Sequence, residues 1–322
     1  MGAVLNVIGV AQCSAMAVGF GSLLRFICFD SKRLVRSFDD VVVPLLRATV
    51  GADPLVYDVL LASSIKFGLA LWGYAEMARL PFDAELVVLG SSFTRVYDDL
   101  VDNFDQPELD DRVAELFSTG RFRPLSDVES LLLALYRSIE TKLARPRDDP
   151  IFAVVQELHR YERQSRRQCD PGISPHEIQR ITRGKGGHAL IAMFALLRPA
   201  MAAEERALLM DLGEVIQLLD DHHDITDDRR AGVRTSTIIG RSTLAGLARQ
   251  VRELHVRLGC FYGKPRVRRL AATLFMLLVG ALFADREPGD RDPARRRRTT
   301  FALLFSPAGN LTRQLRTPGQ VR

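Results

Sequence analysis

Apolar residues recur along most of this 322-residue chain with a helical period, and patterns typical of strands are nearly absent. The candidate helices cover residues 54–80, 84–104, 126–144, 151–167, 174–197, 204–226, 242–259 and 265–284. Connections between them are short, so successive helices are expected to pack as antiparallel neighbours. We therefore predict an all-α fold: a single large helical bundle, in which a chain of this length can enclose a central cavity.

Two helix starts are marked by capping residues. Ser126 and Glu129 form the Ser-x-x-Glu pattern of a capping box, which satisfies free backbone N–H groups at a helix N-terminus. Ser174-Pro175-x-Glu177 combines an N-cap serine, a proline in the first turn and a glutamate three positions after the serine. We expect helices to begin at both places.

Composition divides the chain into three parts. Residues 1–30 are an apolar N-terminal leader of uncertain role, of which residues 1–24 carry no charged side chain. A poorly ordered leader, a misassigned start codon or a first helix that packs on the domain are favoured over a membrane anchor, because glycines interrupt the segment and no basic residue precedes it. Residues 31–285 form the helical domain. Residues 286–322 are an Arg/Pro-rich tail that we expect to be partly disordered.

The net charge of +5 is carried by arginine more than by lysine, and part of it lies in the tail. No helix-turn-helix, zinc or RNA-recognition motif accompanies this charge, so nucleic-acid binding is not expected. The four cysteines are scattered without disulfide or metal-ligand spacing, which indicates a reduced, cytoplasmic protein. The apolar start and the basic tail leave peripheral contact with a membrane as an alternative location.

Acidic residues gather first near the end of the candidate helix at 84–104. Asp98 and Asp102 share one helix face as an i, i+4 pair, and Asp99 flanks them. Like charges at this spacing repel one another, so a plain helix gains nothing from them. A Mg²⁺ ion would remove the repulsion, because it prefers hard oxygen ligands and often bridges carboxylates to substrate phosphates.

A second acidic cluster ends the helix at 204–226, after a largely apolar stretch. Its stripe is formed by Gln217, Asp220 or Asp221, Asp224 and Asp228. One such cluster on a solvated helix is plausible by chance, but two at the ends of apolar helices are much less so. His222 and His223 lie inside this cluster, yet no second Glu-x-x-His element accompanies them as a di-iron site would require. We interpret both histidines as outer or surface residues.

A basic, glycine-rich element lies between the two clusters. Gly184, Gly186 and Gly187 fall inside one predicted helix, where each costs roughly 1 kcal/mol relative to alanine. They indicate close approach of a ligand or of another backbone, or a break in the helix. Lys185 among them is placed to meet an anion; the alternative is tight helix packing with Lys185 turned outward.

Other polar residues are candidates for phosphate binding. Arg163 and Gln164 lie on a helix that either faces the same cavity or presents a solvated surface. Arg229, Arg230 and Arg234 follow the second acidic cluster directly, where guanidinium groups would grip phosphate oxygens.

Together these motifs resemble the trans-isoprenyl diphosphate synthase and class I terpene synthase superfamily. DDLVD at 98–102 resembles its first aspartate-rich motif, and QLLDDHHDITDD at 217–228 resembles its second. Thr182-x-x-Lys185 is similar to the element that these enzymes place between the two motifs, with Gly186 where threonine is usual. The KGG run at 185–187 is also similar to bacterial large-terpene synthases of the tetraprenyl-β-curcumene type.

The resemblance implies a bundle of the isoprenoid-synthase type with a Mg²⁺-dependent active site for a prenyl diphosphate. The implied metal ligands are Asp98, Asp99, Asp102, Asp220, Asp221, Asp224 and Asp228. The implied contacts to substrate are Lys185, Gln217, Arg163, Gln164, Arg229, Arg230 and Arg234. Asp98, Asp102, Asp220, Asp224 and Lys185 would act together as the diphosphate leaves, and the allylic carbocation would react in an apolar pocket.

A chain-elongating synthase also needs a second basic subsite for isopentenyl diphosphate. The nearest upstream match, at residues 32–36, lacks the glycines and proline of the family's element, and Lys66 and Arg95 are among several isolated basic residues. The stretch after Asp102 is acidic where the family is basic. We therefore expect a terpene synthase that ionises one prenyl diphosphate and cyclises or quenches the cation. The alternatives are a chain-elongating prenyltransferase, a non-catalytic partner of a heteromeric synthase and a peripheral membrane-binding protein. The chain is also a candidate homodimer.

Overall fold

The computed structural model describes residues 2–51, 53–103 and 107–284. These residues form helices and connections without strands, which confirms the prediction of an all-α fold. The α-helices are α1 (Gly2–Ala11), α2 (Phe20–Arg25), α3 (Ser31–Val41), α4 (Val43–Thr49), α5 (Pro54–Ala78), α6 (Ala84–Asn103), α7 (Pro107–Thr119), α8 (Asp127–Leu143), α9 (Pro150–Ser165), α10 (Pro175–Ala195), α11 (Ala203–His223), α12 (Ile225–Ala231), α13 (Leu244–Leu258) and α14 (Arg268–Ala284). Short 3₁₀ or π turns connect some of them: η1 (Ser14–Gly19), η2 (Phe26–Asp30), η3 (Arg166–Cys169) and η4 (Gly259–Gly263).

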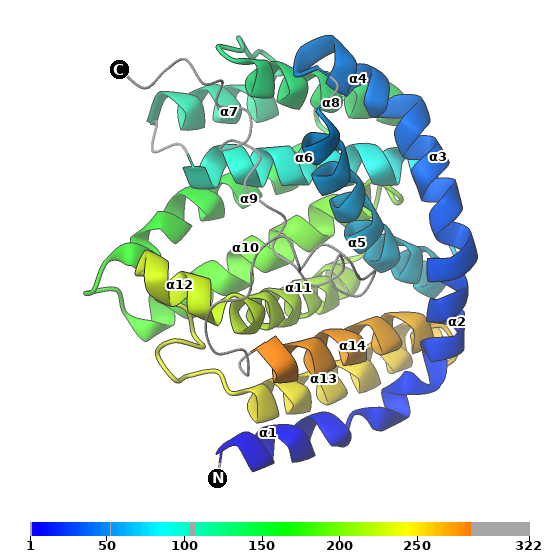
Figure 1. The fold of residues 1–322 in the computed structure, drawn as a ribbon, viewed down its shortest axis with the longest axis vertical. Coiled ribbons are helices and arrows are strands. Elements are labelled where there is room, and N and C mark those ends of the chain that lie inside the picture. Colours follow the sequence, from blue (N-terminus) through cyan, green and yellow to red (C-terminus); the bar gives the residue numbers. More distant parts are fainter. Residues whose placement is uncertain (1, 52, 104–106, 285–322) are drawn as a thin grey trace.

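The helices lie in successive rows, from α7 and α8 at the top of Figure 1 to α1 at the bottom. Helices α10 and α11 run through the middle, with α9 beside α10 and with α13 and α14 beside α11. Helix α5 packs on α6, and α3 covers both along one edge. One apolar core connects all these rows, because each helix presents a hydrophobic face to its neighbours.

Both predicted caps are present. The Ser126 side chain accepts a hydrogen bond from the Glu129 backbone N–H at 3.2 Å, and the Ser174 side chain accepts one from that of Glu177 at 3.1 Å. The Glu129 carboxylate does not close the capping box on Ser126. It accepts instead from the Leu125 backbone N–H and from both terminal nitrogens of Arg112, and so ties α7 to the start of α8.

Several boundaries differ from those predicted. The single helix expected at 204–226 is two helices, because the backbone of Asp224 leaves helical geometry (φ −99°, ψ 8°) and α12 starts at the next residue. Helices α3, α4 and α7 lie in segments for which the sequence predicted no helix. Helix α7 was not predicted because its sequence is acidic. Its Glu108 and Asp110 nevertheless stabilise a helix, since both lie in the first turn near the positive end of the helix dipole.

The N-terminal segment is a packed part of the bundle rather than a separate leader. Val10, Cys13 and Phe26 are buried in the main core. A Cβ atom added to Gly9 would meet the Cα of Ala245 in α13 at 2.9 Å, so α1 crosses α13 at close range. Of the alternatives for residues 1–30, the structure therefore shows a first helix that packs on the domain. The expected tail at 286–322 lies outside the described residues.

Helix α5 is the one described helix that is long and apolar enough to cross a membrane. Leu60, Leu69 and Tyr74 on this helix are nevertheless buried against other helices of the bundle. A core helix passes the same test of length and composition, so this finding does not assign α5 to a membrane.

Candidate active site

A cavity of about 710 Å³ lies among α5, α6, α9, α10, α11, α12 and α14. Its acidic lining residues are Asp98, Asp99, Glu162, Asp220, Asp224, Asp227 and Asp228. Its basic lining residues are Lys66, Arg95 and Lys185. Its larger apolar lining residues are Phe67, Leu71, Leu158, Leu190, Met193, Phe194, Ile216, Leu219 and Leu277. The two predicted acidic clusters and the lysine between them therefore reach a single cavity that is otherwise largely apolar.

The first cluster contributes two described carboxylates with different surroundings. Asp98 lines the cavity. Asp99 is 5% exposed, and its two oxygens accept from Nε and Nη2 of Arg95 at 3.0 and 2.6 Å, one turn earlier on α6. A metal ion at Asp99 would compete with this bidentate pair, so the geometry favours Asp98 over Asp99 as a ligand. The side chain of Asp102 lies outside the described part of the chain, and its role as a ligand stays a prediction.

The second cluster presents Asp220, Asp224 and Asp228 to the cavity across the junction of α11 and α12. The junction is tight, because the backbone carbonyl of Asp224 accepts from the N–H of Asp228 at 2.9 Å and carries the helical turn forward. Burial raises the pKa of Asp224 above its usual range, and the negative charge of Asp220 adds to the effect. Such crowding of negative charge is relieved by a cation.

Asp221 does not line the cavity. Its Oδ1 accepts from Nε2 of Gln217 at 3.2 Å, and its Oδ2 is buried with no hydrogen-bond partner among the described residues. Burial raises the pKa of Asp221 to about 7. Gln217 itself does line the cavity, so it connects the buried Asp221 to the surface where a ligand would bind. This position does not favour Asp221 as a metal ligand.

Lys185 points into the cavity rather than outward. Its Nζ lies 2.9 Å from Oε2 of Glu162, a carboxylate on α9 whose side chain is only 4% exposed. Helix α10 runs unbroken past the three glycines. A Cβ added to Gly186 would lie 2.3 Å from the backbone oxygen of Gly213 on α11, which shows that the glycine permits close approach of another backbone. The crossing of α10 and α11 therefore sets where Lys185 stands relative to the second cluster.

The other predicted substrate-binding residues do not line the cavity. Leu158 and Glu162 form the cavity-facing edge of α9, and each further residue turns about 100° around a helix, so Arg163 and Gln164 face elsewhere. Arg163 pairs instead with Asp111 on α7 at 3.4 Å.

The three arginines after the second cluster do not line the cavity either. Arg229 is exposed, and Arg230 forms an exposed ion pair with Asp227 at 3.3 Å. Arg234 donates to the backbone carbonyl of Pro171 and so fixes the connection after α12 to the start of α10. These residues follow the acidic stripe closely in sequence, but the turn after Ala231 carries Arg234 away from it.

Sequence reasoning missed Lys66, Arg95 and Glu162. Lys66 lies 3.6 Å from Oδ1 of Asp220, across from the second cluster. It is the one basic residue of the 25-residue helix α5, and a single basic residue in a largely apolar helix is the signal that would have found it. Glu162 carried no comparable signal, since it lies in a stretch rich in charged residues.

Of the two histidines interpreted as outer or surface residues, His222 lies outside the cavity and His223 lines it. His222 contacts Ser242 at 3.4 Å outside the cavity lining. His223 is a lining residue, and its Nε2 donates to the backbone carbonyl of Leu277 on α14 at 3.1 Å. Burial lowers the pKa of His223, so the neutral form that links α11 to α14 is favoured.

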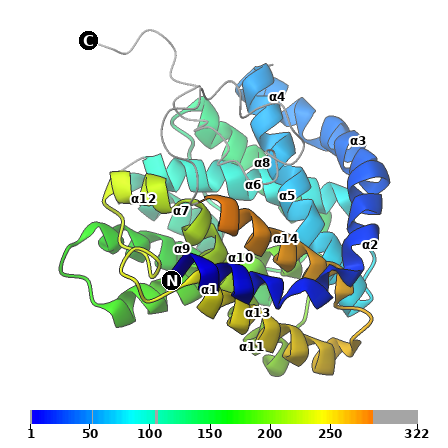
Figure 2. The ribbon, with the colours of Figure 1, turned by 60° about the horizontal axis from the view of Figure 1, so that its bottom comes forward.

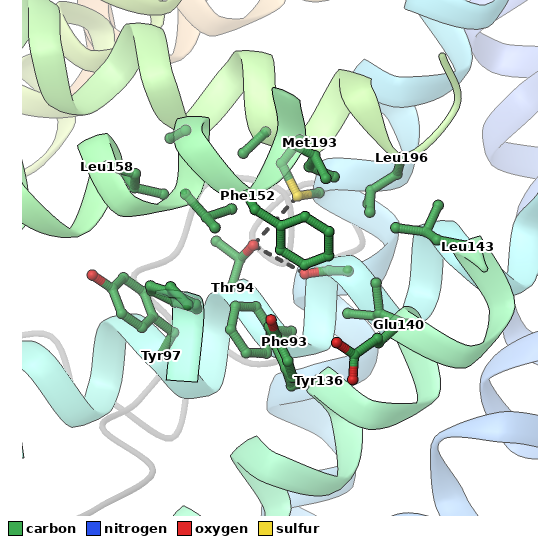
Figure 3. A pocket seen from close by; sticks show the side chains of 17 residues that line it. Phe93, Thr94, Tyr97, Tyr136, Glu140, Leu143, Phe152, Leu158, Met193 and Leu196 are labelled. Atoms are coloured by element: carbon green, nitrogen blue, oxygen red, sulfur yellow. Dashed lines mark hydrogen bonds between the residues drawn. The ribbon is translucent and has the colours of Figure 1, made fainter. Parts of the chain in front are cut away.

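A smaller apolar pocket of about 90 Å³ adjoins the cavity between α6, α8, α9 and α10 (Figure 3). Thr94, Leu158, Ala189 and Met193 line both spaces, so they form the boundary between them. The Thr94 hydroxyl lies 3.3 Å from the sulfur of Met193 at this boundary. The pocket therefore continues the apolar side of the cavity away from the aspartates.

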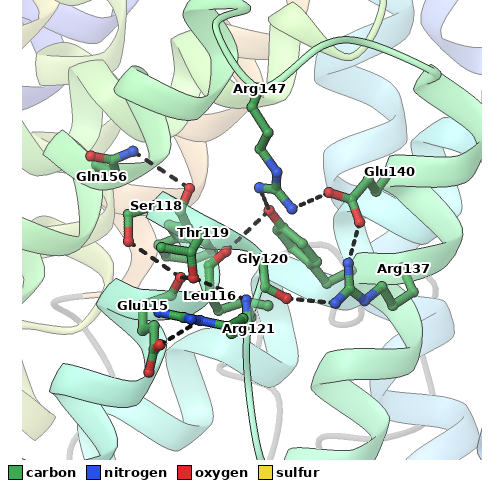
Figure 4. A network of polar contacts seen from close by, with 12 residues as sticks. Glu115, Leu116, Ser118, Thr119, Gly120, Arg121, Arg137, Glu140, Arg147 and Gln156 are labelled. Atoms are coloured by element: carbon green, nitrogen blue, oxygen red, sulfur yellow. Dashed lines mark hydrogen bonds and ion pairs between the residues drawn. The ribbon is translucent and has the colours of Figure 1, made fainter.

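A polar network that includes Arg137, Glu140 and Arg147 lies beside this pocket (Figure 4), since Glu140 is one of its lining residues. Arg147 donates to the Tyr136 hydroxyl at 2.7 Å, and it also pairs with Glu140. Arg137 reaches the other oxygen of Glu140 at 2.6 Å. Since Tyr136 and Glu140 both line the pocket, these contacts satisfy its polar edge and hold its wall in place.

A buried histidine supports the aromatic wall. The Tyr97 hydroxyl donates to Nδ1 of His159 at 2.8 Å, while Nε2 of the same ring donates to the backbone carbonyl of Asp110 at 2.9 Å. The carbonyl can only accept, which makes Nε2 the protonated nitrogen of a neutral ring. Burial lowers the pKa of His159 accordingly.

Comparisons of the chain with protein-family models, with curated proteins and with solved structures found no match. The resemblance to the isoprenoid synthases therefore rests on the sequence motifs.

The donor set fits Mg²⁺ bound together with a phosphate ligand. Among the described residues no three His, Cys, Asp or Glu side chains stand close enough to hold a metal by themselves. Mg²⁺ is commonly held by one or two carboxylates together with water and substrate phosphates, rather than by an all-protein cage. Asp98 on α6 and Asp220, Asp224 and Asp228 on α11 and α12 offer hard oxygen ligands of this kind around one space.

Proposed function

We propose that this chain is a Mg²⁺-dependent class I terpene synthase, an enzyme that ionises an allylic prenyl diphosphate and cyclises or quenches the carbocation. One observation carries the proposal: two aspartate-rich segments that are distant in sequence, together with Lys185, line one cavity with apolar walls. A diphosphate with its metal ions suits the acidic end, and a hydrocarbon chain suits the rest.

The chain's own residues would bind, orient and shield the substrate. When bound, Mg²⁺ supplies Lewis-acid stabilisation of the negative charge that develops on the departing diphosphate. Asp98, Asp220, Asp224 and Asp228 would hold the metal ions against the phosphate oxygens. Lys185 would add an ammonium group from α10 that is already directed into the cavity. The apolar lining would exclude water from the cation once the diphosphate has left.

Glu162 gives Lys185 a defined place before substrate arrives. Its buried carboxylate holds the ammonium group 2.9 Å away. A diphosphate, with more negative charge and several acceptor oxygens, would compete for the same ammonium hydrogens. We expect Glu162→Gln to strengthen binding of inorganic pyrophosphate with Mg²⁺, because Lys185 is then released from its competing partner.

The basic side chains of the cavity favour a reaction with one prenyl diphosphate over chain elongation, because each of them is paired with a carboxylate. Lys66 lies beside Asp220, Arg95 beside Asp99, and Lys185 beside Glu162. Among the described lining residues there is thus no basic group set apart from the carboxylates, as a separate subsite for isopentenyl diphosphate would require. The chain-elongating prenyltransferase remains the second candidate because Lys66 and Arg95 do line the cavity.

The deciding experiment incubates the purified protein and Mg²⁺ with geranyl, farnesyl, geranylgeranyl and longer prenyl diphosphates. Each is tested with and without isopentenyl diphosphate. Hydrocarbon or terpene alcohol formed without isopentenyl diphosphate is the expected result. Longer diphosphates that form only when it is present would identify a prenyltransferase instead. No turnover of any prenyl diphosphate, with Asp220→Asn binding Mg²⁺ and pyrophosphate as the unaltered chain does, would refute both.

A further inference from the structure

The N-terminal helices leave several large apolar side chains exposed on the outside of the bundle. Helix α1 is the outermost helix at the bottom of Figure 1, and Figure 2 brings it to the front, ahead of α13 and α14. One side of the segment is buried in the core through Val10, Cys13 and Met16. Its most exposed large apolar residues are Val4, Leu5 and Ile8 on α1, Val18 in η1, Leu24 on α2 and Phe29 in the adjoining η2, which are 46–70% exposed.

Arginines lie beside this apolar segment at several points. Residues 2–24 carry no charge, and Arg25 is exposed at the end of α2. Arg252 of α13 donates to the backbone carbonyl of Gly9 at 3.3 Å, so its guanidinium group lies directly beside α1. The backbone of the exposed Arg268 touches Gly19 in η1. Helix α13 carries three arginines and one glutamate, and its Arg257 pairs with Asp211 at 2.7 Å; α14 carries two arginines, of which Arg269 pairs with Glu76.

We propose that α1, η1 and α2 form a docking surface for an anionic lipid bilayer, with the apolar side chains in the acyl boundary and the arginines at the phosphate level. Interfacial helices have this combination of a wide apolar face and a basic margin. The core face of the segment stays packed on α13 and α14, so docking needs no unfolding of the bundle.

Charge complementarity decides between a bilayer and other occupants. In a two-fold dimer through this surface, each copy would bring the same arginines to the margin of the interface, and like charges would face one another. The arginine-rich segment 286–322 of the same chain would meet the same repulsion. An anionic lipid surface pairs with the arginines and buries the apolar side chains at the same time.

Docking would also place the cavity close to the lipid phase. Helix α14 contacts η1 and α1 on one side, and its Leu277 lines the cavity on another. One helix layer thus separates the docking surface from the cavity. A strongly apolar substrate or product would need to travel only a short distance between the two, although docking itself does not depend on the proposed reaction.

The test measures co-sedimentation of the full chain with vesicles of phosphatidylglycerol and phosphatidylcholine, and with vesicles of phosphatidylcholine alone. We expect binding to the anionic vesicles that weakens in high salt, and at least about tenfold lower partitioning for Leu5→Ser/Ile8→Ser. The matched control is Leu125→Ser, which alters a leucine in the α7–α8 connection that is more exposed than Leu5 or Ile8, and it should bind as the unaltered chain does. Circular dichroism confirms that each variant is folded.

Two results would overturn the proposal. One is a folded, unaltered chain that stays in the supernatant with both vesicle types. The other is a Leu5→Ser/Ile8→Ser variant that binds anionic vesicles as strongly as the Leu125→Ser control. The competing explanation is that this surface binds a second copy of the chain, and light scattering of the same samples tests it. The unaltered chain would then be a dimer that does not bind vesicles, and the double substitution would dissociate it.

Discussion

Replacing Gly186 by alanine is expected to push α10 and α11 apart and to weaken binding at the cavity. The new Cβ would stand 2.3 Å from the backbone oxygen of Gly213 and 2.8 Å from the Cβ of Gln217. Ordinary contact begins near 3.4 Å, so the helices would have to separate by about 1 Å. The obstacle is backbone and the base of a side chain, neither of which can rotate away.

The magnitude follows from two opposing contributions. Alanine favours a helix by roughly 1 kcal/mol relative to glycine. Overpacking of a tight contact costs about 1–3 kcal/mol, and the upper end applies where backbone blocks the way. The net expectation is a free energy of unfolding that is lower by about 1–2 kcal/mol. The same 1 Å shift moves Lys185 relative to Asp220, and misplacement on this scale weakens diphosphate binding by about tenfold to a hundredfold.

Urea unfolding followed by circular dichroism measures the first effect, and calorimetric titration with Mg²⁺ and pyrophosphate measures the second. The control is Gly21→Ala, because Gly21 is a helical glycine in α2 with no heavy atom within 4 Å of an added Cβ. It should be neutral or stabilising by up to about 1 kcal/mol. If Gly186→Ala matched Gly21→Ala in both measurements, the assignment of this glycine to the helix crossing would be wrong.

Three further predictions follow from the site. Asp220→Asn should weaken Mg²⁺-dependent pyrophosphate binding at least about tenfold by calorimetry, whereas the exposed Asp127→Asn on α8 should not change it; equal effects would remove Asp220 from the metal site. Thr94→Phe should close the passage into the apolar pocket and shorten the longest prenyl diphosphate that is turned over, as chromatography of products from a substrate series would show; an unchanged range would mean that the pocket holds no substrate. Burial lowers the pKa of His159 in the folded chain below the unfolded value of about 6.5. The contribution of His159 to the free energy of unfolding is therefore present above pH 6.5 and is lost as the pH falls below that value, with a slope of up to about 1.4 kcal/mol per pH unit. His159→Gln should therefore flatten the fall in unfolding free energy between pH 7 and about 5, as urea unfolding at a series of pH values would show; a fall as steep as that of the unaltered chain would contradict this role of His159.

Local features of the sequence predicted most of the helices and their starts. The Ser126 and Ser174 caps act within a few residues, so their effect can be read without knowing what packs around them. Helix α7 was missed because its sequence is acidic, and the burial of Leu109, Val113 and Leu116 that stabilises it depends on distant helices. The N-terminal segment was ambiguous for the same reason, since only its neighbours α13 and α14 give its apolar residues a place to pack.

The aspartate-rich segments could be found from sequence because their helical spacing places several carboxylates on one face. Only the tertiary structure decided which of those carboxylates reach the cavity. Asp98 and Asp99 both line it, but the Asp99 carboxylate is held by Arg95. Asp220 lines it as well, whereas Asp221 is buried in contact with Gln217, because a rotation of about 100° about the helix axis separates neighbouring residues.

Packing between distant helices decided the rest of the site. Lys66 and Glu162 line the cavity, whereas Arg163 and Arg234 do not. The orientation of α5, α9 and the segment after α12 decides this, and it depends on contacts with helices that are distant in the sequence. The sequence by itself thus determined the helices and the acidic chemistry that they carry. Whether those carboxylates and Lys185 line the same apolar cavity depends on how closely α10 and α11 cross, and only the packing of the whole bundle determines that distance.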